Sequence, residues 1–296
     1  MIYAHVDSVL GYHLDEEEES VGVLEGKVAL VTGAARGQGR SHTVRLAEEG
    51  ADVIAVDICA QIPSVEIPMA TKEDLDETVR LVEALDRRIV ASVADVRDGV
   101  ALREAVNAGV AELGRLDIVC ANAGVYALTL DEPTDPVQRR QFWQDTIDVN
   151  LTGVWNTVDA AAPIMIEAGN GGAIVLTAST AASKSAANRS LAMDAYTAAK
   201  HGVVGLMRNF AVDLAPHSIR VNTVHPTGVH TPMVENAVVE RYMAENSGFA
   251  KLVLNSLPVD AVDPVDISNA IVYLASDAGR YVTGVQLPVD AGFLVK

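Results

Sequence analysis

Lys27-Val-Ala-Leu-Val-Thr-Gly-Ala-Ala-Arg-Gly-Gln-Gly39 begins with a short apolar run and ends in a glycine-rich turn. The apolar run is nearly continuous, which is typical of a parallel strand that is buried on both faces. Gly33, Gly37 and Gly39 would let the backbone approach a pyrophosphate at the start of the next helix, where unpaired N–H groups and the helix dipole attract anions. The stretch therefore predicts the strand, turn and helix that open a dinucleotide-binding α/β fold.

Strand and helix patterns alternate along the rest of the chain. Further strands are predicted at 52–57, 89–94, 116–121, 173–177, 218–224 and 285–289. Helices are predicted at 40–49, 72–85, 98–113, 137–168, 194–214 and 264–275, with a break in the long fourth helix at Pro163. Seven strands that alternate with helices indicate a single Rossmann-type, doubly wound α/β domain with a seven-stranded parallel sheet over residues 23–296.

Three segments fall outside this alternation. Residues 1–22 contain five consecutive acidic side chains, which repel one another, so we expect a disordered acidic N-terminal extension. Residues 58–71 contain two prolines and are expected to form an inserted loop. Residues 226–260 are expected to form a long loop with helical pieces at about 233–256, which would serve as a lid over the substrate.

The composition argues against several kinds of partner. The 296 residues include 40 acidic and 22 basic side chains, and this net charge of −18 disfavours nucleic acid and anionic lipid. We expect no membrane span and no secretory signal, because the chain lacks the necessary apolar stretches. Cys59 and Cys120 lie in or beside apolar runs, which favours reduced thiols and a cytoplasmic location. No Cys or His cluster has ligand spacing, so we expect no metal site.

Acidic and small residues follow the second, third and fourth predicted strands. Asp57 could accept hydrogen bonds from the adenosine ribose and would repel a 2′-phosphate, which favours NAD over NADP. Arg36 in the glycine turn favours the opposite, because its guanidinium could pair with that phosphate. Asp95, with Val96 beside it, suits the adenine edge, although Asp95 could equally be a turn or cap residue. Asn122-Ala123-Gly124 would place small residues beside the cofactor, or could form an ordinary strand-end turn.

Tyr196 and Lys200 lie four residues apart in a predicted helix, so their side chains share one face. A lysine cation beside a phenol favours the phenolate and lowers the tyrosine pKa toward neutrality. Such a pair also occurs by chance on helix surfaces. Together with the glycine turn, however, it predicts hydride transfer between a nicotinamide and an alcohol or ketone.

Six motifs follow one another in a fixed order, namely Thr32-Gly33-x-x-x-Gly37-x-Gly39, Asn122-Ala123-Gly124, Asn150, Ser179, Tyr196-x-x-x-Lys200 and Pro226-x-x-Val229-x-Thr231. In this order they resemble the short-chain dehydrogenase/reductase family, over residues 24–296. The amino-acid sequence at 33–42, at 199–208 and in the insert after Asp57 is similar to that of the mycofactocin-coupled and carveol-dehydrogenase-like members of the family. The resemblance implies an NAD that does not exchange freely, and electron transfer to mycofactocin, a peptide-derived redox partner.

The resemblance also implies roles for individual residues. Tyr196 would move the hydroxyl proton, Ser179 would hydrogen-bond the substrate oxygen, and Lys200 would bind the nicotinamide ribose and lower the tyrosine pKa. Asn150 would hold a water that relays protons toward Lys200. The implied NAD site comprises Gly33, Arg36, Gly37, Gln38, Gly39, Asp57, Asp95, Val96, Asn122, Ala123, Gly124, Tyr196, Lys200, Val229 and Thr231.

Two points in this resemblance depart from the usual pattern. Ser183 lies at the more common distance before Tyr196, but Ser179 follows the strand directly, so Ser183 is kept as the alternative catalytic serine. The loop 183–194 is then longer than usual, and Thr227 stands where many members have glycine. Because this loop borders the substrate, the resemblance says little about substrate identity.

The sequence thus predicts an NAD-dependent oxidoreductase that interconverts a secondary alcohol and a ketone. The predicted lid is rich in Met, Val and Leu, which favours an apolar or cyclic, terpenoid-like alcohol. Two alternatives stay open: a freely exchanging ketone reductase of β-ketoacyl or steroid type, and a non-catalytic NAD-binding regulator. The resemblance further implies a homotetramer.

Overall fold

The structure is a computed structural model that describes residues 22–184, 190–246, 248, 252 and 254–296. The acidic extension expected at 1–22 lies outside the described residues apart from Gly22. Part of the loop expected at 183–194 and part of the expected lid lie outside them as well.

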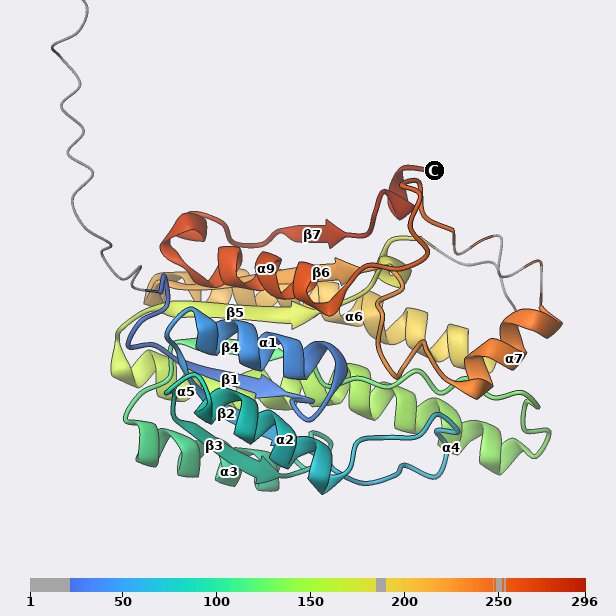
Figure 1. The fold of residues 1–296 in the computed structure, drawn as a ribbon, viewed down its shortest axis with the longest axis horizontal. Helices are drawn as coiled ribbons and strands as arrows, with labels where there is room; N and C mark the ends of the chain where they lie inside the picture. The colour runs from blue at the N-terminus through green and yellow to red at the C-terminus, as the bar shows by residue number, and fades with distance from the viewer. Residues whose placement is uncertain (1–21, 185–189, 247, 249–251, 253) are drawn as a thin grey trace, which may run out of the picture.

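Seven parallel strands form one sheet in the order β3-β2-β1-β4-β5-β6-β7 (Figure 1). The strands are β1 (Val28–Thr32), β2 (Asp52–Asp57), β3 (Ile89–Val93), β4 (Ile118–Ala121), β5 (Gly172–Thr177), β6 (Ile219–Pro226) and β7 (Gln286–Val289). The predicted doubly wound α/β fold is therefore confirmed. The strand order reverses between β1 and β4, and a crevice for a ligand is expected there at the carboxyl ends of the strands.

Helices cover both faces of the sheet (Figure 1). On one face, Leu46 of α1, Leu75 of α2 and Ile271 of α9 belong to one hydrophobic cluster. On the other face, Leu102 of α3 and Val158 of α5 belong to a second cluster, together with α6. The helices are α1 (Gly37–Glu48), α2 (Lys72–Glu83), α3 (Gly99–Leu113), α4 (Pro136–Ile147), α5 (Gly153–Ala168), α6 (Leu191–Asp213), α7 (Ala237–Glu245) and α9 (Pro264–Ala275).

The long fourth helix is irregular at a different place from the one predicted. The expected break at Pro163 is wrong, because α5 runs through that residue. Proline has no N–H to donate to the carbonyl of Asp159, and Arg103 Nη1 donates to this carbonyl instead, at 3.3 Å. The irregular segment is a π-helical turn, η1 (Asp148–Thr152), which joins α4 to α5. It carries Asn150, and π-turns within helices are common at functional sites.

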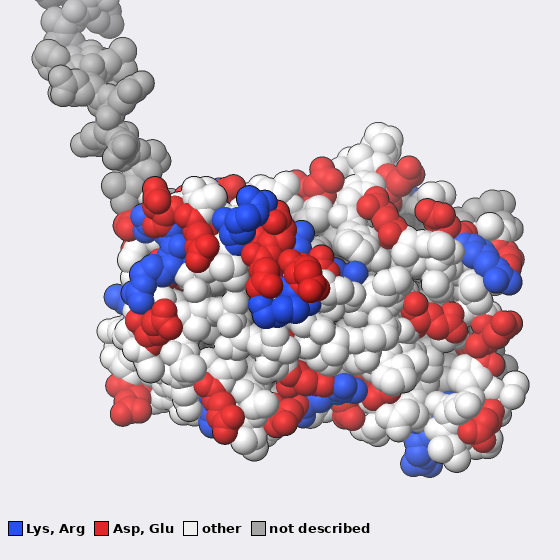
Figure 2. Space-filling model, turned by 60° about the horizontal axis from the view of Figure 1, so that its bottom comes forward, with Lys and Arg blue, Asp and Glu red and all other residues white. Residues whose placement is uncertain are grey.

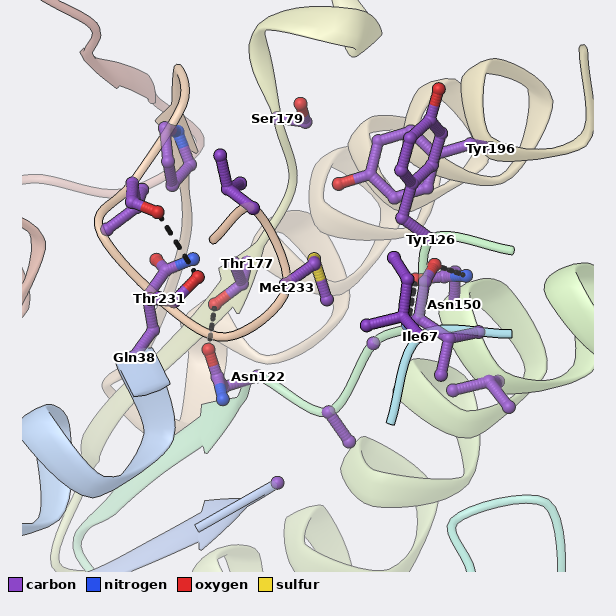
Figure 3. A pocket seen from close by; sticks show the side chains of 18 of the residues that line it. Gln38, Ile67, Asn122, Tyr126, Asn150, Thr177, Ser179, Tyr196, Thr231 and Met233 are labelled. Carbon is purple, nitrogen blue, oxygen red and sulfur yellow. Dashed lines mark hydrogen bonds between the residues drawn. The ribbon is translucent and has the colours of Figure 1, made fainter. Parts of the chain in front are cut away.

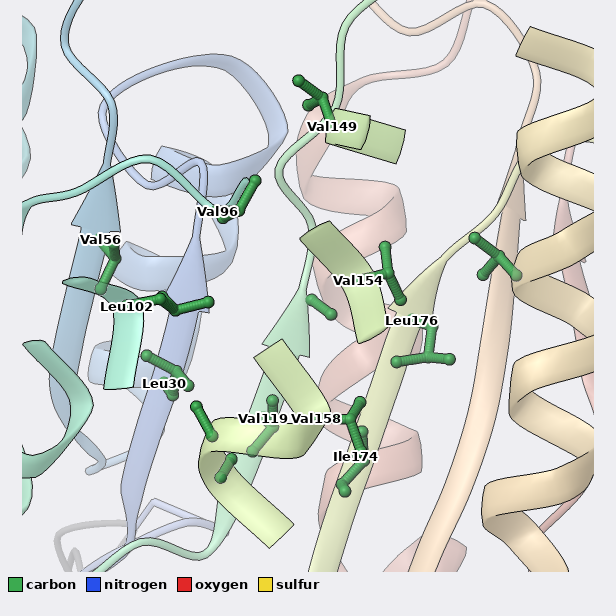
Figure 4. Close-up of a cluster of buried hydrophobic side chains, with 14 of the residues drawn as sticks. Leu30, Val56, Val96, Leu102, Val119, Val149, Val154, Val158, Ile174 and Leu176 are labelled. Atoms are coloured by element: carbon green, nitrogen blue, oxygen red, sulfur yellow. The ribbon is translucent and has the colours of Figure 1, made fainter. Parts of the chain in front are cut away.

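The larger hydrophobic cluster lies between the sheet and the layer of α3, α5 and α6 (Figure 4). Leu30 and Ile174 of the sheet pack in it with Leu102 of α3, and all three side chains are fully buried. Val149 extends the same cluster into η1, and Leu176 extends it to the end of β5. The core therefore fixes the position of η1 relative to the carboxyl end of the sheet.

Charged side chains form mixed groups on the face shown in Figure 2, where Lys and Arg lie directly beside Asp and Glu. Ion pairs of this kind include Arg97–Asp95 at 2.7 Å and Arg115–Asp117 at 2.6 Å. On the described part of this face, the basic side chains form no continuous patch of the kind that a nucleic-acid backbone would contact. Within the described ranges, no helix has the length and apolar character needed to cross a bilayer.

Candidate active site

A cavity of about 430 Å³ runs along the carboxyl ends of the strands (Figure 3). The glycine turn and the ends of β2, β3 and β4 line one part of it. The end of β5, the helix α6 and the segment after β6 line the other part. Of the residues predicted for the site, all line this cavity except Gly37. Gly37 lies beside it, since a Cβ there would meet the Thr231 side chain at 3.4 Å.

The glycine turn brings backbone close to backbone. Gly33 has φ +69°, and a Cβ on it would lie 2.9 Å from Cα of Ala123. A Cβ on Gly39 would lie 1.8 Å from the carbonyl oxygen of Gly33, so a larger residue could not fit there. Helix α1 begins at Gly37, and its cap residue Arg36 gives the first turn no side-chain hydrogen bond. The backbone N–H groups of this first turn therefore lack a side-chain partner, and they suit an anion such as a pyrophosphate.

Asp57 is held at the end of β2 by backbone donors. Its Oδ2 accepts from N of Ala35 at 3.0 Å, and its Oδ1 accepts from N of Cys59 at 3.0 Å. Each oxygen keeps a free lone pair for a ribose hydroxyl. Arg36, which was expected to favour a 2′-phosphate, donates from Nη2 to the carbonyl of Pro68 in the insert. Its guanidinium is therefore directed toward the insert.

Polar side chains follow or end β3, β4 and β5, and Asn122 joins the ends of β1, β4 and β5. Asp95 accepts from Nε of Arg97 at 2.8 Å and from its backbone N at 2.9 Å. Asn122 donates from Nδ2 to the carbonyl of Thr32 at 3.1 Å, and its Oδ1 lies 3.4 Å from Oγ1 of Thr177 (Figure 3). The bonds of Asn122 hold the ends of β1, β4 and β5 together beside the cavity.

Helix α6 presents Tyr196 and Lys200 to the cavity. Lys200 is 3% exposed, and its Nζ donates to the carbonyl of Thr177 at 2.8 Å. The same Nζ lies 5.5 Å from the centroid of the Tyr196 ring. The Tyr196 ring in turn packs edge to face against Tyr126, with centroids 5.4 Å apart (Figure 3). The four-residue spacing thus does place the phenol and the amine together, as predicted.

Burial dominates the protonation of this pair. It raises the pKa of Tyr196 above its ordinary value, while hydrogen bonding with Ser179 acts in the opposite direction. Removal of the phenolate from water outweighs this contact, so the net shift of the Tyr196 pKa is upward and not toward neutrality as expected. The contribution of Lys200 to this pKa stays a prediction. Burial also lowers the pKa of Lys200 to about 8, so most of the amine is still protonated near neutral pH.

The two candidate serines occupy different places. Ser179 follows β5, lines the cavity and caps the short turn after it by accepting from N of Ala181 at 3.1 Å. Ser183 is exposed and does not line the cavity. The geometry therefore favours Ser179 as the residue that contacts substrate.

Asn150 is fully buried in η1, and its side chain binds the backbone (Figure 3). Nδ2 donates to the carbonyls of Val125 and Thr146, both at 2.9 Å, and Oδ1 accepts from N of Val125 at 3.2 Å. The amide therefore fastens the segment after β4 to the π-turn. Its role in holding a water stays a prediction.

The segment after β6 closes over the glycine turn. Val229 pairs with Val262 in an isolated parallel bridge, and Oγ1 of Thr231 donates to the carbonyl of Val229 at 3.2 Å. Val239 and Met243 of α7 line the cavity beyond them. These positions suit the predicted cofactor contacts and the predicted lid, whose movement stays a prediction.

Sequence reasoning missed several residues that line the cavity. Tyr126 was overlooked, although its place just after Asn122-Ala-Gly puts it at a strand end. Ile62, Val65 and Ile67 of the insert were treated as loop, although apolar residues that recur between prolines indicate burial. Lys184 and Phe293 had no local signal, because they meet only in the folded chain.

Comparison with known proteins agrees with this geometry. A family profile described as enoyl-(acyl carrier protein) reductase matches residues 33–294. The (−)-trans-carveol dehydrogenase of Rhodococcus erythropolis is 47% identical over 284 residues, which cover 92% of this chain and 99% of that protein. The crystal structure of carveol dehydrogenase from Mycobacterium avium in complex with NAD superposes with a TM-score of 0.85, at 53% identity over 93% of this chain and all of that one.

A short chain dehydrogenase from Mycobacterium paratuberculosis bound to NAD gives the same TM-score of 0.85, at 49% identity over 93% of this chain and 100% of that chain. Both solved structures therefore contain the nucleotide that Asp57 was expected to favour. Motif order, fold and relatives agree, and the chain belongs to the short-chain dehydrogenase/reductase family.

Proposed function

We propose that this protein is an NAD-dependent dehydrogenase that interconverts a secondary alcohol and a ketone. One observation carries the proposal: Ser179, Tyr196 and Lys200 line the same cavity as the glycine turn and Asp57. The residues fit NAD, because the turn at Gly33 and Gly39 is too tight for any Cβ, and the start of α1 beside it has no side-chain cap and suits a pyrophosphate. NAD bound there would supply the acceptor for the hydride that leaves the alcohol carbon.

The chain supplies the proton chemistry and the positioning. In the oxidative direction, the alcohol O–H proton passes to the ionised Oη of Tyr196 as the hydride leaves the carbon. The Ser179 hydroxyl holds the same oxygen. Burial opposes ionisation of Tyr196, and the positive charge of Lys200, 5.5 Å from the ring centroid, favours it. The Lys200 amine would also bind the nicotinamide ribose.

We further propose that NAD is held without free exchange, which the insert supports, and that it is re-oxidised by mycofactocin, which rests on the family resemblance alone. Ile62, Val65 and Ile67 are buried in the main hydrophobic cluster and also line the cavity. Oγ of Ser64 donates to Oδ2 of Asp145 in α4 at 2.7 Å, so the insert spans from β2 to α4. Arg36 ties its other end to the glycine turn. A cofactor beneath this insert would have a blocked exit.

The lining of the cavity supports an apolar substrate. Met233, Val234, Val239 and Met243 come from the lid region, and Met193 comes from α6. Such side chains contribute burial and few directional bonds. The similarity to a (−)-trans-carveol dehydrogenase points the same way. We therefore infer an apolar, cyclic, terpenoid-like secondary alcohol as the substrate class.

Nucleotide content is the test of this function. Protein purified without added nucleotide is denatured, and released NAD, NADH and NADP are quantified by mass spectrometry. Stoichiometric NAD or NADH supports retention, and turnover of (−)-trans-carveol is then followed with a dye acceptor. Protein that is free of nucleotide but reduces ketones with added NADH would be the freely exchanging reductase. Bound NAD without turnover of any alcohol would favour the regulator, and bound NADP would contradict the role given to Asp57.

The quaternary state and the location are separate proposals that rest on the family resemblance. We propose a homotetramer in the cytoplasm. Sedimentation equilibrium at several protein concentrations tests the first, because a mass equal to a single chain would contradict it. Fractionation of producing cells tests the second.

A further inference from the structure

The last residues of the chain return to the cavity. After β7, Asp290 accepts from N of Gly292 at 3.0 Å and from N of Leu294 at 2.9 Å, and this organises one helical turn, η5 (Phe293–Val295). Phe293 is 7% exposed, and its side chain lines the cavity. Val295 in the same turn is 83% exposed. The turn therefore directs one aromatic ring inward and one aliphatic side chain outward.

Lys184 holds this ring from the catalytic side. It follows the short turn that begins at Ser179, and it also lines the cavity. Its Nζ lies 5.0 Å from the centroid of the Phe293 ring, within the range of a cation–π contact. The same Nζ donates to the carbonyl of Phe293 at 3.3 Å and to that of Lys296 at 3.2 Å. The ring is therefore tied to the segment that presents the substrate-binding serine.

The end of the lid region holds the same turn from the other side. N of Ser256 donates to the carbonyl of Ala291 at 3.1 Å, and Oγ of Ser256 donates to the carbonyl of Gly292 at 2.7 Å. Nζ of Lys296 donates to the carbonyl of Asn255 at 2.6 Å. The turn that carries Phe293 is therefore anchored from two sides.

We propose that Phe293 is a specificity-determining residue that closes the substrate end of the cavity and limits the alcohol to a single-ring skeleton. The proposal rests on the proposed function, because it assigns that end of the cavity to substrate. Ser179 and Lys184 belong to one short segment, so a ring held by Lys184 lies on the side where the reacting oxygen is bound. Lys184 is a positioning residue in this scheme. A second fused ring would meet the Phe293 side chain.

The test compares Phe293→Ala with Val295→Ala, which shortens a side chain of the same turn outside the cavity. Binding of cyclohexanone and of trans-2-decalone, a fused bicyclic ketone, is measured by calorimetry on the protein as purified. In Phe293→Ala we expect affinity for the decalone relative to cyclohexanone to rise by about tenfold. Val295→Ala should keep the wild-type ratio. Lys184→Met, which keeps the chain length but removes the cation, should shift the ratio in the same direction by less.

An unchanged ratio in Phe293→Ala would overturn the proposal, and so would an equal shift in Val295→Ala. If Phe293→Ala fails to fold, Phe293→Leu takes its place and must shift the ratio in the same direction. The wild type could bind neither ketone while a Phe293 variant binds the decalone. This result would support Phe293 as the residue that closes the cavity, and it would contradict the single-ring substrate class. Absence of binding in every variant would overturn both.

Discussion

The two ends of the cavity are built from different kinds of contact. At the cofactor end, the Asp57 carboxylate binds backbone N–H groups only 2 and 22 positions away in the chain. At the substrate end, the Lys184 amine binds the carbonyl of Phe293, 109 positions away. The Asp57 contacts depend on local backbone shape, and the wall at Phe293 depends on side chains that only the folded chain brings together.

This difference suits the two tasks. A dinucleotide presents the same phosphates and riboses to every enzyme that uses it, so a short stretch of backbone can encode its site. A substrate differs from one enzyme to the next, and loops held by long-range contacts can change without disturbing the sheet. The insert after β2 is an exception, because it belongs to the cofactor end but is anchored on α4 through Ser64.

The largest expected effect separates the two ends completely. Tyr196→Phe removes the proton acceptor but keeps the ring that packs against Tyr126. We expect kcat to fall by about 10³-fold, since general acid–base catalysis is lost. The NAD content, measured by mass spectrometry after denaturation, should not change. Full activity in this variant would contradict the mechanism.

A second variant tests whether backbone shape governs the cofactor end. Gly39→Ala would force a Cβ to within 1.8 Å of the Gly33 carbonyl oxygen, and the strain should cost about 3 kcal/mol of unfolding free energy. NAD content should fall with it. Gly205→Ala is the matched control, because that exposed helical glycine has no atom within 4 Å of an added Cβ. It should stabilise the protein by about 1 kcal/mol. Normal NAD content in Gly39→Ala would show that backbone shape does not govern the cofactor end.

Lys200 lies where the two ends meet, and its burial predicts a pH dependence. Its pKa is lowered to about 8 in the folded protein from its ordinary value of 10.5, so the unfolded chain binds more protons between these values. The unfolding free energy should therefore rise as pH increases, by about 2 kcal/mol from about pH 8 to about pH 9.5. Denaturant titrations of the wild type and Lys200→Met measure the difference. Equal slopes for both proteins would show that Lys200 does not titrate in this window.

The smallest expected effect concerns the insert. Ser64→Ala removes a hydrogen bond to the buried Asp145 carboxylate, and release of bound NADH should become about tenfold faster. NADH fluorescence during a chase with excess NAD follows the release. Ser92→Ala is the control, since this partly buried serine of β3 makes no side-chain hydrogen bond to any described residue. Equal release rates in both variants would show that the insert is held by burial alone.

Much of the cofactor end could be predicted from the sequence. The apolar run before Gly33, the acid at Asp57 and the four-residue step from Tyr196 to Lys200 are short-range patterns, and the folded chain keeps their spacing. Helix boundaries were less accurate. Helix α6 begins at Leu191, because Ser190 caps it, and not at Asp194 as predicted.

The remaining errors share one cause. The break expected at Pro163 does not occur, because Arg103 of another helix binds the carbonyl that the proline leaves without a partner. The Tyr196 pKa shifts upward and not downward, because burial outweighs its favourable contacts. Neither effect can be predicted from the local sequence, since both depend on contacts with residues of other helices and strands.

The sequence by itself determined the alternation of strands and helices, the place of the glycine turn and the spacing of the residues that we propose transfer the proton. These features follow from local periodicity and from backbone conformations that only glycine adopts easily. The tertiary structure alone decided the π-turn at Asn150, the course of the insert and the meeting of Lys184 with Phe293. Such contacts join residues far apart in the chain, and their energies depend on burial, which exists only once the whole sheet and its helices have packed.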